Sequence, residues 1–157
     1  TYKPGSFETG MFPMVAVSEG GDNTLNFKNL CGILALNLTG QDTIATITFS
    51  AKDETGNPKV ISGLFGVDTD FTEAPTIDYI LEAGETAPDR SRHYITFDCG
   101  EEGVLLDPSN NTTFYIVLPA GTYNTFSVLI TTTDGKIMYK EGRKPLNIVS
   151  QTGCSSD

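Results

Sequence analysis

The stretch TFYIVLPAGTYNTFSVLITTTDGKIMYK, residues 113–140, decides the fold. Apolar and polar side chains alternate through it and are interrupted twice, by Pro-Ala-Gly at residues 119–121 and by Asp-Gly at residues 134–135. A period of two places successive side chains on opposite faces of a sheet, and Asp-Gly supplies the positive φ angles of a tight hairpin turn. The stretch therefore predicts three consecutive antiparallel strands. It is typical of a scaffold and contains no catalytic motif.

The rest of the chain repeats this pattern in shorter pieces. Two long runs, residues 30–38 and 44–51, are separated by a turn at residues 40–42, so we expect them to pair as neighbours. Further strands are expected at residues 12–17, 59–62, 64–67, 76–81, 93–99, 104–106 and 144–149. Many short strands with closely spaced turn signals predict an all-β fold, an antiparallel β-sandwich of about seven to ten strands.

One domain spanning residues 1–157 is the simplest organisation. A chain of this length buries roughly 70% of its unfolded surface, which is enough for one core. Residues 1–22 are expected to form an irregular N-terminal arm and residues 150–157 a flexible tail, because both are interrupted by glycine or rich in polar residues. No internal repeat or linker divides the chain.

The charge balance disfavours two classes of partner. Ten Lys and Arg residues stand against twenty Asp and Glu residues, which gives a net charge of −10. Nucleic-acid binding depends on neutralising phosphates with basic side chains, so nucleic acids and anionic membranes are poor partners. No apolar run reaches the ~20 residues of a membrane helix, so direct membrane insertion is not expected. Because the chain begins at Thr1, we expect a trimmed product whose export signal lies outside this sequence.

The sequence has three cysteines without metal-ligand spacing. Cys31 and Cys99 each precede a glycine in strand-like surroundings. In an exported protein they would close a loop of about 69 residues if adjacent, and a disulfide there would contribute about 4 kcal/mol. The alternative is a pair of buried thiols that pack as small apolar groups. Cys154, in the polar tail, is expected to be free.

No residue is nominated as catalytic. His93 is the single histidine, and no serine near it forms a nucleophile motif, so it is interpreted as a structural strand residue. Paired carboxylates for glycoside hydrolysis remain open, although the chain has no tryptophan to line a sugar cleft. The Asp-Thr-Asp run at residues 68–70, and Asp53 and Glu54 with Asn57, offer oxygen ligands for calcium but lack EF-hand spacing. The prediction is a protein that is not an enzyme and uses no cofactor or metal.

Two blocks of sequence resemble the fimbrillin-like surface proteins of Bacteroidales. They span residues 12–40 and 98–136, and the residues that carry the likeness are Phe27, Leu30, Cys31, Gly32, Phe114, Tyr115, Leu118, Pro119 and Gly121. The resemblance implies an exported, lipoprotein-derived β-sandwich of transthyretin-like topology on the cell surface. It also implies polymerisation by strand donation in the pilin members. Those pilins usually have two domains, so this chain is a single-domain relative, an N-terminal half or a non-polymerising adhesin. The C-terminal SQTGCSSD does not resemble an apolar donor strand.

The same resemblance singles out Thr43. Asp42-Thr43-Ile44 fits the short O-glycosylation motif of this bacterial group, an Asp followed by Thr and an aliphatic residue. The alternative is that Thr43 is simply a turn residue.

The sequence thus leads to two functional hypotheses. The first is a cell-surface structural or adhesive protein, a fimbrial subunit or adhesin module that binds other subunits or host and bacterial surface ligands by strand addition or through its loops. It requires an open groove or an unpaired strand edge. The alternative is a surface glycan-binding module in which Tyr2, Tyr79 or Tyr123 stacks on sugar rings. It requires several tyrosines together on one exposed face.

Overall fold

The computed structural model describes residues 4, 13–17, 25, 27–68 and 75–150. In this part of the chain the regular elements are thirteen β-strands and one short 3-10 helix. Every strand pair is antiparallel. The prediction of an all-β, antiparallel sandwich is therefore confirmed.

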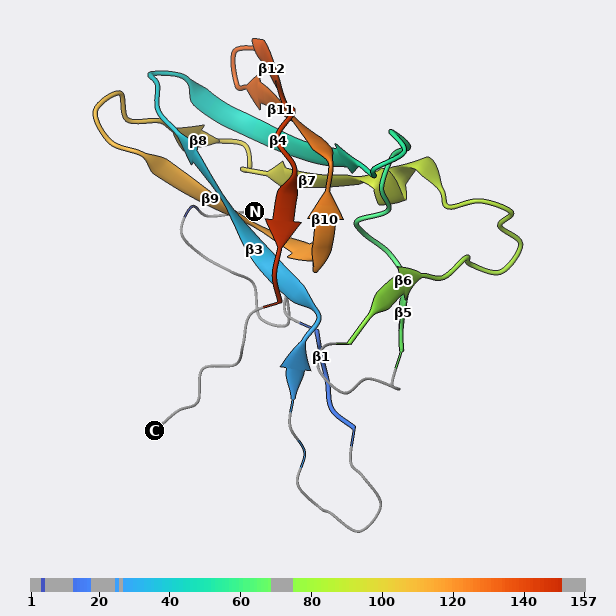
Figure 1. The fold of residues 1–157 in the computed structure, drawn as a ribbon. Helices are drawn as coiled ribbons and strands as arrows, with labels where there is room; N and C mark the ends of the chain where they lie inside the picture. The colour runs from blue at the N-terminus through green and yellow to red at the C-terminus, as the bar shows by residue number, and fades with distance from the viewer. Residues whose placement is uncertain (1–3, 5–12, 18–24, 26, 69–74, 151–157) are drawn as a thin grey trace.

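One layer of the sandwich is a five-stranded sheet, called here the larger sheet. Its strands run in the order β12-β11-β4-β7, and β8 pairs with the start of β4. They are β4 (Thr43–Lys52), β7 (Tyr94–Asp98), β8 (Val104–Leu105), β11 (Thr125–Thr132) and β12 (Ile137–Gly142). Among the described strands β12 pairs with β11 alone, so it forms one edge of this sheet (Figure 1).

The second layer consists of two strand pairs. One is β3 (Cys31–Leu38) with β9 (Thr112–Pro119), and the other is β10 (Gly121–Tyr123) with β13 (Leu146–Ile148). The pairs approach each other at the start of β3, where a Cβ on Gly32 would lie 2.2 Å from the carbonyl oxygen of Val149. Beyond that point β3 runs diagonally away from β13 (Figure 1). The second layer is therefore split, whereas the larger sheet is continuous.

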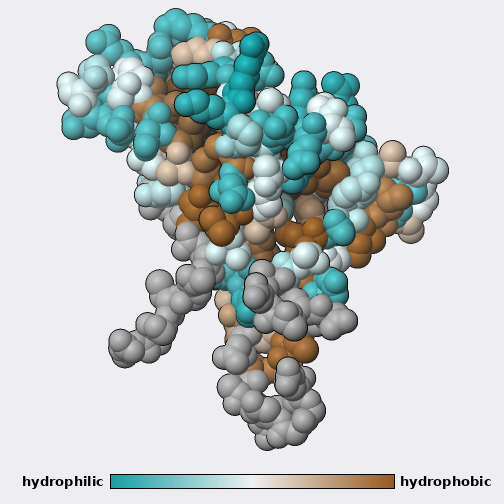
Figure 2. Space-filling model, viewed as in Figure 1, coloured by the Kyte–Doolittle hydropathy of each residue, from teal (hydrophilic) through white to brown (hydrophobic). Residues whose placement is uncertain are grey.

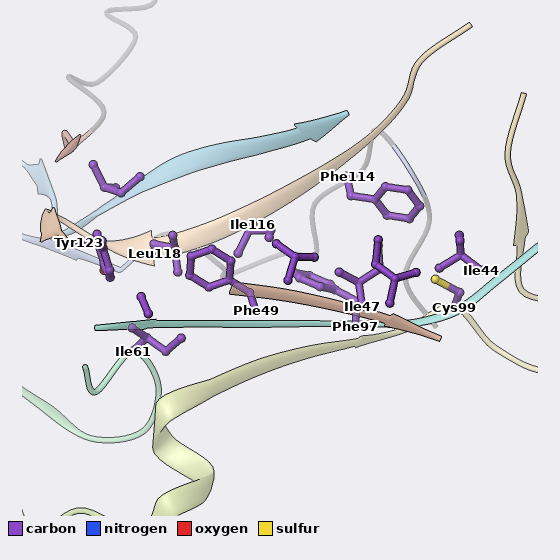
Figure 3. Packing of buried hydrophobic residues seen from close by; sticks show 14 of the residues in the cluster. Ile44, Ile47, Phe49, Ile61, Phe97, Cys99, Phe114, Ile116, Leu118 and Tyr123 are labelled. Carbon is purple, nitrogen blue, oxygen red and sulfur yellow. The ribbon is translucent and has the colours of Figure 1, made fainter. Parts of the chain in front are cut away.

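The hydrophobic core fills the space between the two layers. Alternate residues of β4 and β9 point into it, so that Ile47, Phe49, Phe114, Ile116 and Leu118 are fully buried. Figure 3 shows these side chains interleaved between β3 and β9 on one side and β4, β7 and β11 on the other. Period-two alternation on both layers is what produces such a core. The alternation in residues 44–51 predicts that Ala45, Ile47 and Phe49 point inward. This is confirmed for Ile47 and Phe49, whereas at the start of β4 Ile44 is buried and Ala45 is not.

Two small hairpins complete the described structure. β1 (Met14–Val15) pairs with β2 (Lys28–Asn29) beside the start of β3. β5 (Phe65–Val67) pairs with β6 (Ile77–Tyr79), and these strands extend to one side of the sandwich (Figure 1). The 3-10 helix η1 (Arg90–His93) leads directly into β7.

The prediction that residues 30–38 and 44–51 pair with each other is wrong. These residues form β3 and β4, which belong to opposite layers: β3 pairs with β9, and β4 lies between β11 and β7. The connecting turn carries the chain across the sandwich. Both strands have one apolar face, and two such faces bury more surface against each other across a core than side by side in one sheet.

The predicted three-strand meander is confirmed only in its second half. β11 and β12 form the expected hairpin, and Gly135 in the turn has φ +85°, as the Asp-Gly signal required. β9 instead lies in the second layer, and the chain passes through β10 before it enters β11. The Pro-Ala-Gly break at residues 119–121 is therefore a crossing between strands of one layer and not a hairpin turn.

The strand expected at residues 59–62 is not formed. The amides of Ile61 and Ser62 both donate to the carbonyl oxygen of Arg92, at 2.9 and 3.1 Å, instead of to a neighbouring strand. Val60 and Ile61 are both buried although they are adjacent, which a strand with one solvent face does not allow. His93, expected in a strand, ends η1. Most of the expected arm, and all of the tail except Ser150, lie outside the described residues.

Candidate functional site

The two cysteines expected to be able to pair are both free. Cys31 and Cys99 are buried thiols. Cys99 lies beside Ile44 at one end of the core, and Tyr123 lies at the other end (Figure 3). Cys31 is close enough to Tyr123 for the two side chains to interact electrostatically, so the two cysteines are at opposite ends of the core. Burial raises the pKa of both thiols. Cys31 and Cys99 do not form a disulfide in this structure, which contains the other alternative, two buried thiols. Cys154 lies outside the described residues.

His93 ends η1, directly before β7. Its Nδ1 atom is buried and has no hydrogen-bond partner among the described residues. A general base needs a nucleophile and an orienting carboxylate within hydrogen-bond reach. His93 has neither in the part of the chain that the structure describes.

In the acidic turn considered for calcium, the Asp53 carboxylate already accepts hydrogen bonds from other residues of the same turn. One oxygen of Asp53 accepts bonds from the Thr55 amide, the Thr55 hydroxyl and the Asn57 amide, at 2.9, 2.7 and 2.9 Å. These bonds, led by the one from the Thr55 hydroxyl, lower the pKa of Asp53. In the Asp-Thr-Asp run, Asp68 is described and residues 69–70 lie outside the described part.

The tyrosines predicted to stack on sugar rings differ in their exposure to solvent. Tyr123 is fully buried, and its hydroxyl donates to the carbonyl oxygen of Pro119 at 2.6 Å, so it cannot contact a ligand. Its ring lies 4.5 Å from the Nζ atom of Lys59. Tyr79 is 47% exposed and borders a hollow of about 420 Å³ that Asp53 and Lys59 also line. Tyr2 lies outside the described residues.

Thr43, the candidate for O-glycosylation, is the first residue of β4. It is half-buried and pairs with Leu105 of β8. Its neighbour Asp42 accepts a hydrogen bond of 2.6 Å from Lys136. Glycosylation of Thr43 stays a prediction.

The outer edge of β12 exposes both backbone groups and apolar side chains. The amide of Thr132 donates to the carbonyl oxygen of Lys136, which fixes the phase of the β11–β12 ladder. Because antiparallel residues alternate between bonded and non-bonded pairs, the N–H and C=O groups of Ile137, Tyr139 and Glu141 point away from β11. Ile137 and Tyr139 are 69% and 64% exposed. No described strand lies on this side of β12.

The outer face of the larger sheet, which points away from the core, carries several threonine and serine hydroxyl groups. Three cross-strand pairs bond to each other through their side-chain oxygens: Thr46 with Thr131, Thr48 with Thr96, and Ser50 with Ser127. All six residues sit opposite one another in the strand registers, which is why their hydroxyls meet. Asp98, opposite Thr46, and Leu129, opposite Thr48, lie on the same face as these hydroxyls.

Two tyrosines flank one end of this hydroxyl surface. Tyr94 of β7 pairs with Ser50, Ser50 with Ser127, and Ser127 with Glu141, so that these four residues form one row across four strands. Tyr139 stands on the same face as Glu141, two residues earlier in β12. A depression of about 110 Å³ is lined by Ser50, Ser127, Tyr94, Tyr139 and Glu141, among other residues. We call this set of five the tyrosine depression.

The sequence pattern alone could not have found the tyrosine depression. Alternation already separates Tyr94 from Ile95, and Tyr139 from Met138, so each tyrosine can be placed on an outer face. What the pattern lacks is the strand order. Only the sequence of neighbours β7-β4-β11-β12 brings Tyr94 and Tyr139, from distant parts of the chain, to the same surface.

A larger hollow is apolar and carries no catalytic group. It measures about 570 Å³ and lies between the β5–β6 hairpin and the two layers, with Phe65, Ile77, Ile95 and Val117 in its wall. The only titratable side chain among its lining residues is the buried thiol of Cys31. Figure 2 shows apolar surface on the same side of the molecule. Leu64, just before β5, and Ile80 and Leu81, just after β6, are exposed.

Among the described residues no helix is long and apolar enough to span a membrane. In the same part of the chain no three His, Cys, Asp or Glu side chains gather where they could hold a metal ion. Comparisons of the chain with family models, curated proteins and solved structures found no match.

Proposed function

We propose that this protein is a structural or adhesive module of a cell surface, and that it joins subunits of its own kind by strand addition at the outer edge of β12. The observation that carries the proposal is the row of backbone groups on Ile137, Tyr139 and Glu141 that point away from β11. An extended segment laid along this edge would continue the larger sheet.

The chemistry of β12 favours such an addition. Unpaired strand edges are templates for pairing, and natural proteins usually protect them with bulges, proline or a covering loop. β12 has neither a proline nor a described covering element, and Ile137, Met138 and Tyr139 expose apolar surface in succession. Lys140 and Glu141 are the only charged residues of the strand. An added strand would gain backbone hydrogen bonds of about 0.5–1.5 kcal/mol each together with apolar burial.

Two features of the sequence support a surface role. The net charge of −10 keeps an exposed protein soluble and disfavours nucleic-acid partners. The resemblance of residues 12–40 and 98–136 to fimbrillin-like surface proteins implies export and assembly through strands. Other fimbrial subunits, and ligands on host or bacterial surfaces, are the partners that this proposal entails.

The test uses a proline on the exposed edge. Ile137→Pro removes an amide that points away from β11, a position where an edge strand tolerates proline. Ile137→Thr is the matched control, because it removes the same apolar side chain and keeps the amide. Both variants should unfold at similar urea concentrations, which excludes a general loss of structure.

The readout is molecular mass by light scattering and sedimentation velocity over a range of concentrations, before and after protease trimming of residues 1–12. We expect oligomers for the wild type and for Ile137→Thr, and a monomer for Ile137→Pro. A wild type that stays monomeric up to hundreds of micromolar, trimmed and untrimmed, would overturn strand addition between copies. Oligomers that persist in Ile137→Pro would move the interface away from β12.

A further inference from the structure

The geometry points to a second, separate site: the tyrosine depression is a binding site for a neutral sugar ring of a glycan. The site is built from the side-chain face of the larger sheet, whereas strand addition would use the backbone edge of β12. The two sites therefore share Tyr139 and Glu141 but use different groups of these residues.

The floor of the depression offers hydrogen bonds that a sugar can complete. Two hydroxyls together have two donors and four acceptor lone pairs, and the bond of 2.6 Å between Ser50 and Ser127 uses one of each. One donor and three lone pairs remain. The carboxylate of Glu141, whose Oε2 lies 3.9 Å from Nε of Arg143, adds further acceptors at the end of the row, and its side chain keeps 36% of its surface exposed. A ligand rich in hydroxyl groups supplies both donors and acceptors to such a floor.

The walls of the depression supply flat apolar faces. Tyr94 is 38% exposed and Tyr139 is 64% exposed, one on each edge strand of the row. Three strand spacings separate Tyr94 from Glu141, roughly 14 Å between Cα atoms. Aromatic rings present large rigid contact surfaces with a polar tip, and this suits a ligand with one apolar face and a rim of hydroxyls. A pyranose ring has this character.

Size and charge narrow the choice of ligand. A volume of about 110 Å³ is well below the ~300–1,000 Å³ of pockets that enclose drug-sized molecules, so the occupant is one ring lying on the sheet. Lys52 and Glu141 both line the depression, Glu141 is paired with Arg143, and the whole chain carries a net charge of −10. Because this overall charge disfavours anionic sugars and phosphate groups, the ligand is a neutral ring.

The test titrates a panel of neutral oligosaccharides of glucose, galactose and mannose into isotopically labelled protein, with sialylated and sulfated oligosaccharides as the anionic comparison. Amide signals are followed by NMR. We expect at least one neutral oligosaccharide to shift the signals of residues 50, 94, 127, 139 and 141 in a saturable way, at millimolar or lower concentrations. The anionic members of the panel should cause smaller shifts.

Variants then separate stacking from folding. Tyr139→Ala and Tyr94→Ala should each weaken binding about tenfold, whereas Tyr139→Phe, which keeps the ring, should bind nearly as well as the wild type. Tyr79→Ala is the matched control, since it removes an exposed tyrosine outside the depression. Ile137→Pro should bind the sugar normally, so failure of strand addition and failure of sugar binding are distinguishable.

Two results would overturn the assignment. The first is that no neutral oligosaccharide shifts the amide signals of these residues at any concentration up to about 10 mM. The second is binding that survives in the double variant Tyr94→Ala/Tyr139→Ala or is lost in Tyr79→Ala. The latter would assign recognition to the hollow beside Tyr79.

Discussion

The Nη2 atom of Arg92 donates a hydrogen bond of 2.7 Å to the carbonyl oxygen of Leu64. Nη1 of the same buried side chain donates to the carbonyl oxygen of Ile80 at 2.9 Å and lies 3.5 Å from a carboxylate oxygen of Glu85. One guanidinium group therefore connects η1 to the segments on both sides of the β5–β6 hairpin. Since the hairpin forms part of the wall of the apolar hollow, Arg92 also fixes the shape of that hollow.

Replacement of Arg92 by methionine should destabilise the protein by about 2–4 kcal/mol, because it removes the side-chain donor to the carbonyl oxygens of Ser62 and Ile80 and leaves Glu85 without its ion-pair partner. Urea unfolding measures the loss. In hydrogen exchange, the amide of Ile80, which donates to Leu64, should lose protection before the amides of β4 do. Arg90→Met, in the same 3-10 helix but exposed, is the control and should change stability by less than about 0.5 kcal/mol. Equal losses in the two variants would contradict the role given to Arg92.

Gly32 is the contact point between the two halves of the second layer. An added Cβ would lie 2.2 Å from the carbonyl oxygen of Val149 and 2.7 Å from Cγ2 of Ile148. Because the closest atom belongs to the backbone, Gly32→Ala should force the end of β13 away from β3 and cost about 1–3 kcal/mol.

The matched control for Gly32 is Gly40→Ala. Its Cβ would meet only the end of the Leu106 side chain, at 3.3 Å, and that side chain can move. Differential scanning calorimetry of both variants measures the contrast as a difference in Tm. If Gly32→Ala melts at the wild-type temperature, β13 does not press on β3 at this point.

Cys31 and Cys99 should resist alkylation in the folded protein. Both thiols are buried, and burial raises their pKa, so the reactive thiolate is scarce near neutral pH. Iodoacetamide in the native state should therefore leave both unlabelled, as read by peptide mass spectrometry. Denaturation without any reductant should expose both to full labelling. Labelling that appears only after a reductant is added would reveal a disulfide.

The Asp53 turn should make stability depend on pH at the acidic end. Its hydrogen bonds hold the pKa of Asp53 below the ordinary value of about 3.9 that it has in the unfolded chain. The stability that the ionised carboxylate contributes is thus present above pH ~4 and is lost as the pH falls through the lower folded value. The difference in urea midpoint between wild type and Asp53→Asn should shrink steadily from pH 6 to pH 2.5. A difference that stays constant over this range would show that Asp53 does not titrate with a lowered pKa.

The strands and their faces were largely readable from the sequence. Alternation in residues 125–132 and 137–142, with Asp-Gly between them, was enough to predict the β11–β12 hairpin, because a turn and its two strands are local. The inward direction of Ile47 and Phe49 followed from the same period. The prediction failed where successive residues are both buried, as at Val60 and Ile61, because such a segment has no strand-like alternation to read.

The amino-acid sequence by itself thus determined that the chain forms β-strands, which side of most strands is apolar, and where the tightest turn lies. Only the tertiary structure decided which strands are neighbours, because every strand offers the same backbone donors and acceptors and the choice among partners is made by packing across the core. That choice separated β3 from β4, kept Cys31 away from Cys99, and left β12 at an edge. It also brought Tyr94 and Tyr139 to the two ends of one hydroxyl-lined surface.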